Sequence, residues 1–452
     1  MRELLERAAS AAARYLEGID ARPVAPGEPA LACLAGLDGP LPAESLPPEA
    51  VLDLLDRLGS PAPVATAGRR FFGFVHGGSL PAALAANWLA GAWDQNAALT
   101  VTSPVASTLE ETSLRWLVDV LGLPPEAGGA FVTGATMANF TALAAARHAV
   151  LARAGWDVEG DGLAGAPPVT VLVSEEVHPS VIKALGLLGF GRRKPVAVPV
   201  DGQGRMRLDA LPRFDPPAIV CTQAGNVNTG ACDPVSAICD AAHARQAWVH
   251  VDGAFGLWAA ASPAFAHLVA GVGAADSWAT DAHKWLNVPY DSGLAFVRDP
   301  RHLNRAMALT AAYIPQYGRR EPSQFTPELS RRARGVEVWA ALRSLGRAGL
   351  AALIERTCAH ARRFAEGLRA DGWEVLNDVV LNQVLVAFGD AAATRRVIAR
   401  IQRDGTCWCG ETLWQGHVAM RISVCSWATT DRDVALSLDA MLRAAAGERR
   451  LP

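Results

Sequence analysis

The chain has 452 residues, half of them hydrophobic and 19% charged, and its formal net charge is only −3. This balance excludes the basic surface that binding to nucleic acid or to an anionic membrane requires, and no apolar stretch is long enough to span a bilayer. The amino-terminal helical pattern carries charges every few residues, unlike the unbroken apolar core of a secretion signal. We therefore expect a cytoplasmic protein whose partners are small molecules.

Residues 1–75 are predicted to form a helical arm. The segment MRELLERAASAAARYLE has the pattern of an amphipathic helix and precedes the Pro-rich stretches ARPVAPGEPA and GPLPAESLPPEA. A segment of this kind does not build a core of its own. We expect it to lie over another surface, which in an oligomer would be the neighbouring chain.

Residues 76–310 are predicted to form a large α/β domain. Short β-branched apolar runs alternate there with helical or Gly- and Pro-containing segments, which is typical of βα units. Continuous apolar runs indicate a mostly parallel central sheet with helices on both faces. The runs are GAFVT, VTVLVS, PVAVPV, AIVCT, AWVHVD, DSWAT and GLAFVR.

Residues 311–333 interrupt this pattern with a polar, aperiodic segment. Long loops inside compact proteins are often lids or binding loops, and a surface linker is the alternative. We predict a lid loop. Residues 334–452 then show helical patterns followed by short strands, which indicates a small carboxyl-terminal α+β domain.

The eight cysteines are scattered along the chain without the paired spacing of metal ligands. The closest pair, Cys407 and Cys409, flanks a tryptophan in the carboxyl-terminal segment. We expect free, buried thiols and no metal site.

Polar or small residues stand directly after several predicted strands. Because ligands bind beyond the carboxyl ends of parallel strands, these positions are candidates for a site. Ala135 and Thr136 follow GAFVT at the start of a helical stretch, where free backbone N–H groups hold a phosphate, although ordinary turns use similar residues. His178 follows VTVLVS and offers a flat ring for stacking, with a surface histidine as the alternative.

Two further strand ends carry Thr222 and Asp252. Thr222 leads into a Gly- and Asn-rich loop that either brings backbone close to a ligand or simply turns the chain. Asp252 closes a mostly apolar strand, so its carboxylate needs a cationic partner or a strong donor. A structural ion pair is the competing explanation for Asp252.

The last strand end carries Lys284 between a histidine and a tryptophan. Of the 42 basic residues only Lys183, Lys194 and Lys284 are lysines. Arginine stays protonated, so a site whose amine must attack a carbonyl has to use one of these three. Lys183 lies in a helical pattern and Lys194 follows two arginines, which favours surface positions for both. Lys284 is our candidate.

A phosphate cradle, a stacking ring, a buried carboxylate and an imine-forming lysine together suit pyridoxal 5′-phosphate. This cofactor has a phosphate, an aldehyde that condenses with lysine, and a pyridine nitrogen that must stay protonated for the ring to act as an electron sink. A carboxylate beside that nitrogen raises the nitrogen's pKa.

At these residues the sequence also resembles the group II pyridoxal-dependent decarboxylases, which include aromatic amino-acid, histidine and glutamate decarboxylases. The resemblance runs from about Phe71 to Val434 and is most specific in WVHVDGAFG and FAHLVAGVGAADSWATDAHKWL, with VTGATMANFTALAAAR and SEEVHPSVIKALGLLG in support. It implies a fold-type I α/β architecture and a homodimer with active sites at the subunit interface, which would explain the amino-terminal arm.

The resemblance also implies a role for each candidate residue. These roles are Lys284 as the imine lysine, Asp252 as partner of the pyridine nitrogen, Ala254 under the ring, His178 above it, Ala135, Thr136 and His283 near the phosphate, Thr222 near the cofactor hydroxyl, and Arg421 for the substrate carboxylate.

Two positions depart from the family pattern. Asp281 stands where the family usually has Asn, which leaves the role of this residue open. The lid tyrosine that protonates the product has no secure match in the shorter loop. We favour Tyr317 as this acid, because Tyr313 matches a structural tyrosine.

The implied activity is decarboxylation of an L-amino acid to its amine and CO₂, with an aromatic substrate favoured. One alternative is a decarboxylase of glutamate or of another acidic or basic amino acid. Another is an aromatic aldehyde synthase, which couples decarboxylation to oxidative deamination. An interaction protein on the same fold is disfavoured, because Lys284, Asp252 and His178 are all present.

Overall fold

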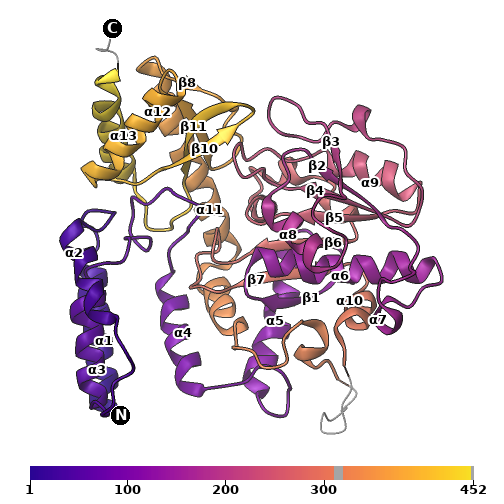
Figure 1. Cartoon of the computed structure of the whole chain (residues 1–452), viewed down its shortest axis with the longest axis horizontal. Helices are drawn as coiled ribbons and strands as arrows, with labels where there is room; N and C mark the ends of the chain where they lie inside the picture. The colour runs from indigo at the N-terminus through magenta and orange to yellow at the C-terminus, as the bar shows by residue number, and fades with distance from the viewer. Residues whose placement is uncertain (310–318, 449–452) are drawn as a thin grey trace. The chain divides into compact units, whose positions relative to one another are not determined.

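The computed structural model describes residues 1–309 and 319–448, and the chain divides into two compact units (Figure 1). The first unit consists of Met1–Gly78, His360–Leu376 and Val384–Pro452. The second consists of Ser79–Ala359 and Asn377–Gln383. No helix among the described residues is both long and apolar enough to cross a membrane.

The first unit combines the amino-terminal helices with the carboxyl-terminal sheet. Its elements are α1 (Arg2–Gly18), α2 (Glu28–Cys33), α3 (Pro48–Gly59), β8 (Glu374–Val375), β9 (Gln383–Ala387, whose first residue belongs to the second unit), α12 (Ala391–Asp404), β10 (Gly410–Trp414), β11 (His417–Ser423) and α13 (Asp431–Ala446). The sheet has the order β10-β11-β9-β8. Phe72 joins the two parts, because its N–H donates to the Trp408 carbonyl and its carbonyl accepts from the Ser423 N–H, both at 2.9 Å.

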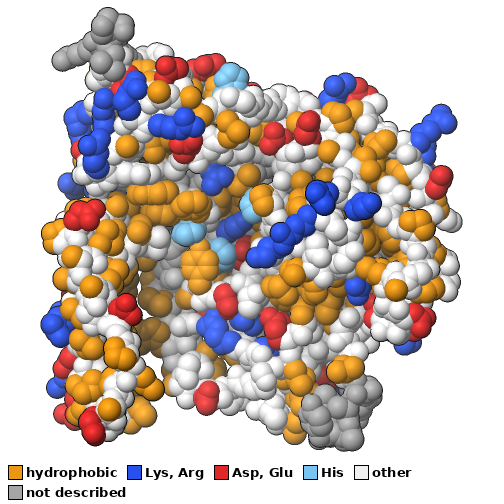
Figure 2. Space-filling view, in the orientation of Figure 1, with side chains coloured by type: hydrophobic (Ala, Val, Ile, Leu, Met, Phe, Trp, Pro, Cys, Tyr) orange, Lys and Arg blue, Asp and Glu red, His pale blue; other side chains and the backbone are white. Residues whose placement is uncertain are grey.

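Helices α1 and α3 lie side by side and are linked by ion pairs from Arg7 to Asp53 and from Arg14 to Asp56. Many of their large apolar side chains nevertheless remain exposed. Figure 2 shows hydrophobic side chains along the surface of the segment from Arg2 to Gly59, called the α1–α3 helices here; exposed large apolar residues of this segment include Leu5, Leu16, Leu31, Leu34, Leu37, Val51 and Leu55.

The second unit is built on a seven-stranded sheet with the order β1-β7-β6-β5-β4-β2-β3. Only β7 runs against its neighbours β1 and β6, while β2 to β6 pair in parallel. The mostly parallel sheet that the apolar runs predicted is therefore confirmed. The strands are β1 (Gly128–Val132), β2 (Thr170–Ser174), β3 (Val196–Val198), β4 (Ala218–Gln223), β5 (Trp248–Asp252), β6 (Ser277–Asp281) and β7 (Gly293–Val297).

Proline marks the start of many helices. It occupies the first turn, where a backbone N–H has no acceptor within the helix, so that a residue without an N–H costs no hydrogen bond. Helices with proline in the first turn are α2, α3, α4 (Pro81–Trp93), α5 (Pro104–Val120), α8 (Pro179–Leu187) and α10 (Pro300–Met307). The remaining helices of the second unit are α6 (Ala135–Arg153), α7 (Val158–Asp161), α9 (Val235–His243) and α11 (Gly335–Ala370), whose last part enters the first unit. Short 3₁₀ segments span Leu34–Leu37, Leu208–Ala210, Gly256–Ala261, Ala266–Val269, Val272–Ala274 and Pro322–Phe325.

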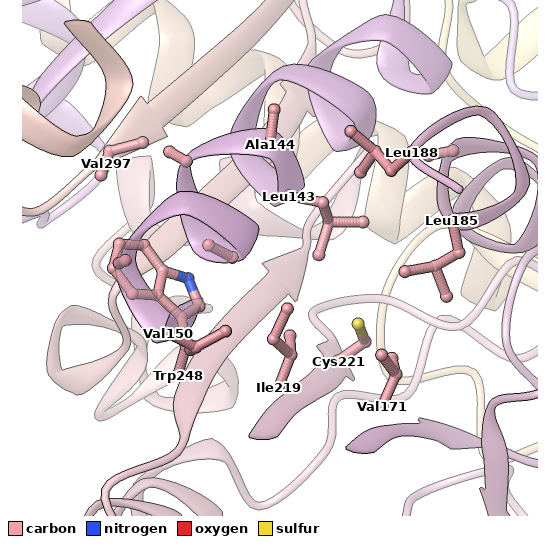
Figure 3. Close-up of a cluster of buried hydrophobic side chains, with 14 of the residues drawn as sticks. Leu143, Ala144, Val150, Val171, Leu185, Leu188, Ile219, Cys221, Trp248 and Val297 are labelled. Atoms are coloured by element: carbon pink, nitrogen blue, oxygen red, sulfur yellow. The ribbon is translucent and has the colours of Figure 1, made fainter. Parts of the chain in front are cut away.

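Helix α6 is the central packing element of the second unit. Small side chains at Ala138, Ala142, Ala145 and Ala149 are fully buried and recur every three or four residues, which places them on one face of the helix. Its larger residues meet α8 and the sheet in an apolar cluster (Figure 3), in which Leu143 and Val150 lie with Val171, Leu185, Leu188, Ile219, Cys221 and Trp248. Truncating one of the buried leucines to Ala would destabilise this layer by about 2–5 kcal/mol. The cluster thus fixes the carboxyl-terminal half of α6 against the sheet.

Candidate active site

The sequence-predicted polar residues of the second unit gather at one edge of its sheet. Strands β2, β4, β5 and β6 are parallel, so their carboxyl ends meet at the same edge. Asp252 ends β5, Thr222 lies near the end of β4, and Lys284 follows the end of β6 by three residues. His178 is the N-cap of α8, in the connection that follows β2.

Asp252 is a buried carboxylate with neutral partners. Its Oδ1 accepts from the Ala254 N–H at 3.1 Å, and its Oδ2 accepts from Asn139 Nδ2 at 3.2 Å. No ion pair to Asp252 forms among residues 1–309 and 319–448, so the structure does not support the competing explanation of a structural ion pair. A buried anion held only by neutral donors is stabilised by an added cation, and a protonated pyridine nitrogen is such a cation.

Behind Asp252 lies a polar cluster that the sequence analysis missed. Asn139 Oδ1 is 2.9 Å from His250 Nε2, and His250 Nδ1 is 2.9 Å from Ser277 Oγ. Burial lowers the pKa of His250 to about 4, so the ring is neutral at physiological pH. A signal was present in WVHVD, because residues two apart on a strand face the same way and His250 therefore shares the Asp252 face.

His178 is oriented by the start of α8. Its Nδ1 accepts from the Ser180 backbone N–H at 3.2 Å and lies 2.7 Å from Ser180 Oγ. Because the backbone N–H can only donate, Nδ1 carries a lone pair, and the proton of the neutral ring is on Nε2. The ring position is thus set by the helix rather than by a mobile loop.

The predicted phosphate cradle at the start of α6 already contains an anionic side chain. The Ala135 N–H donates to Asp281 Oδ2 at 2.9 Å, and Asp281 Oδ1 lies 2.7 Å from His283 Nδ1, an ion pair when His283 is protonated. Thr136 is the next residue of the helix. Gly134, which directly precedes α6, approaches Gly293 so closely that a Cβ at 293 would lie 2.4 Å from the Gly134 backbone. The close approach requires glycine at 293, and the positive φ of +153° at 134 favours glycine there.

Tyr290 is a second residue that the sequence analysis missed. Its ring centroid lies 4.0 Å from that of His283, and 56% of the residue is exposed. Tyr313 and Tyr317, the two candidates for the lid acid, lie outside the described residues.

Lys284 differs from the other two lysines in its surroundings. Ala282, Trp285 and Leu286 are fully buried, and the Trp285 indole N–H donates to Thr357 Oγ1 at 2.9 Å, which fixes the turn that carries Lys284. Lys284 itself is half-buried, whereas Lys183 and Lys194 are exposed. The buried setting suits an amine that must act as a nucleophile.

The end of β4 offers unpaired donors. The Thr222 hydroxyl donates to the His250 carbonyl at 3.3 Å within the sheet. By contrast, Gln223 Nε2 and Asn226 Nδ2 are buried and have no hydrogen-bond partner among the described residues. Gln223 is the register partner of Asp252, so one of these donors belongs to the strand end beside the carboxylate. Buried donors without a partner are costly, and a polar ligand would satisfy them.

Arg421 belongs to the first unit, where it lies on β11 opposite Gly410. Burial lowers the pKa of Arg421 to about 10, which still leaves the guanidinium charged at neutral pH. In the part of the chain that the structure describes, His, Cys, Asp and Glu side chains form no group of three that could hold a metal ion.

These observations fit pyridoxal phosphate. Within the described ranges 1–309 and 319–448, a carboxylate without a cation, a half-buried lysine and unpaired amide donors lie at or just beyond the strand ends of one sheet. The fit concerns the residues of the second unit alone.

Comparisons with known proteins agree with this fit. Residues 61–389 match the pyridoxal-dependent decarboxylase conserved domain. The chain is 28% identical to tryptophan decarboxylase 1 of Oryza sativa subsp. japonica, over 94% of this chain and 89% of the relative. It is 30% identical to L-2,4-diaminobutyrate decarboxylase of Rhizobium meliloti, over 79% of this chain and 74% of the relative.

A solved structure, Oryza sativa TDC with PLP and tryptamine, superposes with a TM-score of 0.90 at 24% identity, covering 99% of this chain and 98% of that one. A structure of mouse CSAD gives a TM-score of 0.86 at 22% identity, covering 97% and 98%. At these identities the likeness shows the fold alone. It confirms the predicted fold-type I architecture.

Proposed function

The chain belongs to the pyridoxal-dependent decarboxylase family and is a pyridoxal-phosphate-dependent carboxy-lyase, and from this premise we propose that its substrate is an aromatic L-amino acid. The observation that carries the proposal is the extent of the match to tryptophan decarboxylase 1, which covers 94% of the chain. An aromatic-L-amino-acid decarboxylase of Bacillus atrophaeus also matches, over 80% of the chain. The partly exposed ring of Tyr290 beside His283 offers a surface on which an aromatic side chain can stack.

A second candidate substrate class is a basic or acidic amino acid. The relatives with the higher identities, 30% and 33%, are an L-2,4-diaminobutyrate decarboxylase and an aspartate 1-decarboxylase. Their matches cover less of the chain, 79% and 55%, which is why we favour the aromatic class.

The experiment that separates the two classes is a decarboxylation screen with the cofactor-loaded enzyme. Aromatic, acidic and basic L-amino acids are supplied in turn, and CO₂, amine, aldehyde and hydrogen peroxide are measured. The proposal expects kcat/KM for an aromatic substrate to exceed that for glutamate, aspartate and diaminobutyrate by at least about tenfold. A preference for a charged substrate would overturn it. Aldehyde and peroxide in place of amine would identify an aldehyde synthase.

In the proposed reaction Lys284 would bind the cofactor aldehyde covalently, and Asp252 would hold the pyridine nitrogen in its protonated form. The bound cofactor supplies an electron sink for the pair left when the carboxylate departs. His178 would pack on one side of the cofactor ring and Ala254 on the other. Residues proposed for the remaining contacts are Ala135, Thr136 and His283 for the phosphate, Thr222 for the ring hydroxyl, Arg421 for the substrate carboxylate and Tyr317 for the returning proton.

We also propose that the enzyme is a homodimer with active sites at its interface. Support comes from the exposed apolar side chains of the α1–α3 helices and of α4, where Trp88, Leu89 and Trp93 are 46%, 55% and 41% exposed. Burial of such side chains against a second copy would contribute about 25 cal/mol per Å². Sedimentation should give a dimer that Leu89→Glu weakens. Leu413→Glu, at a residue 67% exposed on β10, is the matched control; a monomeric native chain would contradict the proposal.

A further inference from the structure

Asn139 is a fully buried amide on α6, about one turn after the helix begins. Its Nδ2 donates to Asp252 Oδ2 and to Ser180 Oγ, each at 3.2 Å, and its Oδ1 faces His250 Nε2 at 2.9 Å. An ionised carboxylate only accepts hydrogen bonds, so the amide nitrogen has to face Asp252. The orientation of the amide is therefore determined by its partners.

This orientation fixes the direction of the hydrogen bonds behind Asp252. Because Asn139 Oδ1 accepts, the proton of neutral His250 is on Nε2, and His250 Nδ1 accepts from the Ser277 hydroxyl at 2.9 Å. Ser277 Oγ in turn accepts from the Trp248 indole N–H at 2.8 Å. Each donated hydrogen in this series has one acceptor, and the last acceptor is Asp252.

A second branch leads from the same amide to His178. Since Ser180 Oγ accepts from Asn139 Nδ2, its own proton is directed to His178 Nδ1, 2.7 Å away. The Ser180 backbone N–H adds a second donor to the same nitrogen. Both hydrogens of the Asn139 amide group are thus used, one toward the Asp252 carboxylate and one toward Ser180, which in turn donates to His178.

We propose that Asn139 is a positioning residue that holds, with one amide, both the Asp252 carboxylate and, through Ser180, the His178 ring in place for the cofactor. This inference rests on the roles proposed above for Asp252 and His178. Asn139 is fully buried on the packed helix α6, so the two N–H groups of its side chain are held in a fixed position. They therefore orient a carboxylate more tightly than water molecules would.

Cofactor affinity tests the proposal without any substrate. The cofactor-free enzyme is titrated with pyridoxal phosphate, and the absorbance gives the dissociation constant. Asn139→Ala is expected to raise this constant by about tenfold or more, in line with the loss of a group that orients a ligand residue. The isosteric Asn139→Asp keeps the acceptor for His250 but removes both donors, so it is expected to weaken binding at least as much. Wild-type affinity in Asn139→Asp would overturn the proposal.

A double-mutant cycle separates positioning from a general structural role. If Asn139 acts in part through Asp252, Asn139→Ala costs clearly less affinity in the Asp252→Asn background than in the wild type, and the remaining loss reports the branch through Ser180 to His178. Fully additive losses would mean that Asn139 only supports the fold, and would overturn the proposal. Thr141→Ala is the matched control, because Thr141 is equally buried on α6 and its hydroxyl has no partner among the described residues. Its affinity is expected to be unchanged.

A cofactor-independent readout completes the test. In ¹⁵N-histidine spectra of the cofactor-free enzyme, with His250→Gln used for assignment, His250 should be protonated only at Nε2. Asn139→Ala should abolish this single tautomer, and an unchanged tautomer would contradict the geometry. If Asn139→Ala does not fold, Asn139→Asp and Ser180→Ala carry the affinity test. None of these measurements uses a substrate. Their results therefore do not depend on whether the substrate is an aromatic amino acid.

Discussion

The Ala135 backbone N–H donates to the Asp281 carboxylate at 2.9 Å, so an acidic side chain caps the helix whose N-terminus is proposed to hold the cofactor phosphate. Asparagine at this position would accept the same hydrogen bond without the negative charge. The acid thus places a like charge beside an anionic ligand.

Asp281→Asn is therefore expected to tighten the binding of pyridoxal phosphate by about fivefold or more, since two like charges roughly 4 Å apart repel by about 1 kcal/mol even in a water-like medium. Titration of the cofactor-free enzyme measures the effect. Asp276→Asn is a matched control, because Asp276 precedes the same strand and pairs with His243 at 2.9 Å. Weaker binding in Asp281→Asn would show instead that the ion pair with His283 assists the phosphate.

Lys284→Arg is expected to keep the positive charge but to lose the covalent attachment of the cofactor, because an arginine does not lose its proton at neutral pH. Borohydride reduction of the wild type, followed by peptide mass analysis, should place the pyridoxyl group on Lys284. The exposed Lys183 and Lys194 serve as internal controls. A label on either of them in place of Lys284 would refute the assignment.

Asp252→Asn is expected to lower kcat by about 10²–10³ while cofactor still binds, because the amide no longer stabilises a protonated pyridine nitrogen. Turnover under saturating cofactor is the measurement. A near-normal rate would mean that Asp252 is structural.

The sequence predicted the sheet well, because most of its strands are buried and read as continuous apolar runs; the exception is the edge strand β3, of which only Val198 is buried. The segments VTVLVS and AWVHVD contain β2 and β5, and AIVCT covers β4 except for its last residue, Gln223. The candidate residues at the ends of these strands could also be found. Residues that directly follow parallel strands all lie at the same edge of the sheet, where ligands bind.

Contacts between distant elements could not be predicted in this way. Asn139 and Asp252 are far apart in the chain and meet only because α6 packs over the sheet. The same holds for Phe72, which bonds to residues near the carboxyl terminus and places the amino-terminal segment in the first unit. Periodicity reports which face of an element is buried, but not which neighbour covers it.

His250 should make the stability of the protein depend on pH. Burial lowers its folded pKa from 6.5 to about 4, so the unfolded chain binds the proton more readily. The contribution of neutral His250 to the free energy of unfolding is fully present above pH 6.5. It is lost as the pH falls toward 4, by up to about 3 kcal/mol. Asp233 acts in the opposite direction, because burial raises its pKa to about 6.

The test is therefore the difference between the wild type and His250→Gln. Urea unfolding at intervals from pH 7.5 to pH 4 should show a smaller loss of stability on acidification in the variant. Parallel curves would contradict the low pKa of His250.

Tyr317→Phe is expected to bind cofactor and substrate but to release less amine, with aldehyde and hydrogen peroxide in its place. A phenol stays protonated at neutral pH, since its ordinary pKa is about 10, and phenylalanine removes only that proton. The segment just after Tyr317 is firmly held: Arg320 pairs with Glu110 at 3.2 Å, and Arg331 pairs with the same carboxylate at 2.9 Å. These two ion pairs to Glu110 suit a segment that follows the proposed proton donor, because the donor has to be held at a defined position.

Tyr313→Phe and Tyr290→Phe are the matched comparisons, because the three variants remove the same hydroxyl from different positions. The measurement is the ratio of amine to aldehyde at saturating substrate. Diversion in Tyr313→Phe alone would move the acid to that residue, and diversion in Tyr290→Phe alone would assign it to the ring that lies against His283. If all three variants make amine at the wild-type rate, the proton comes from a group other than these tyrosines, and His178, whose neutral ring carries its proton on Nε2, is the next residue to replace.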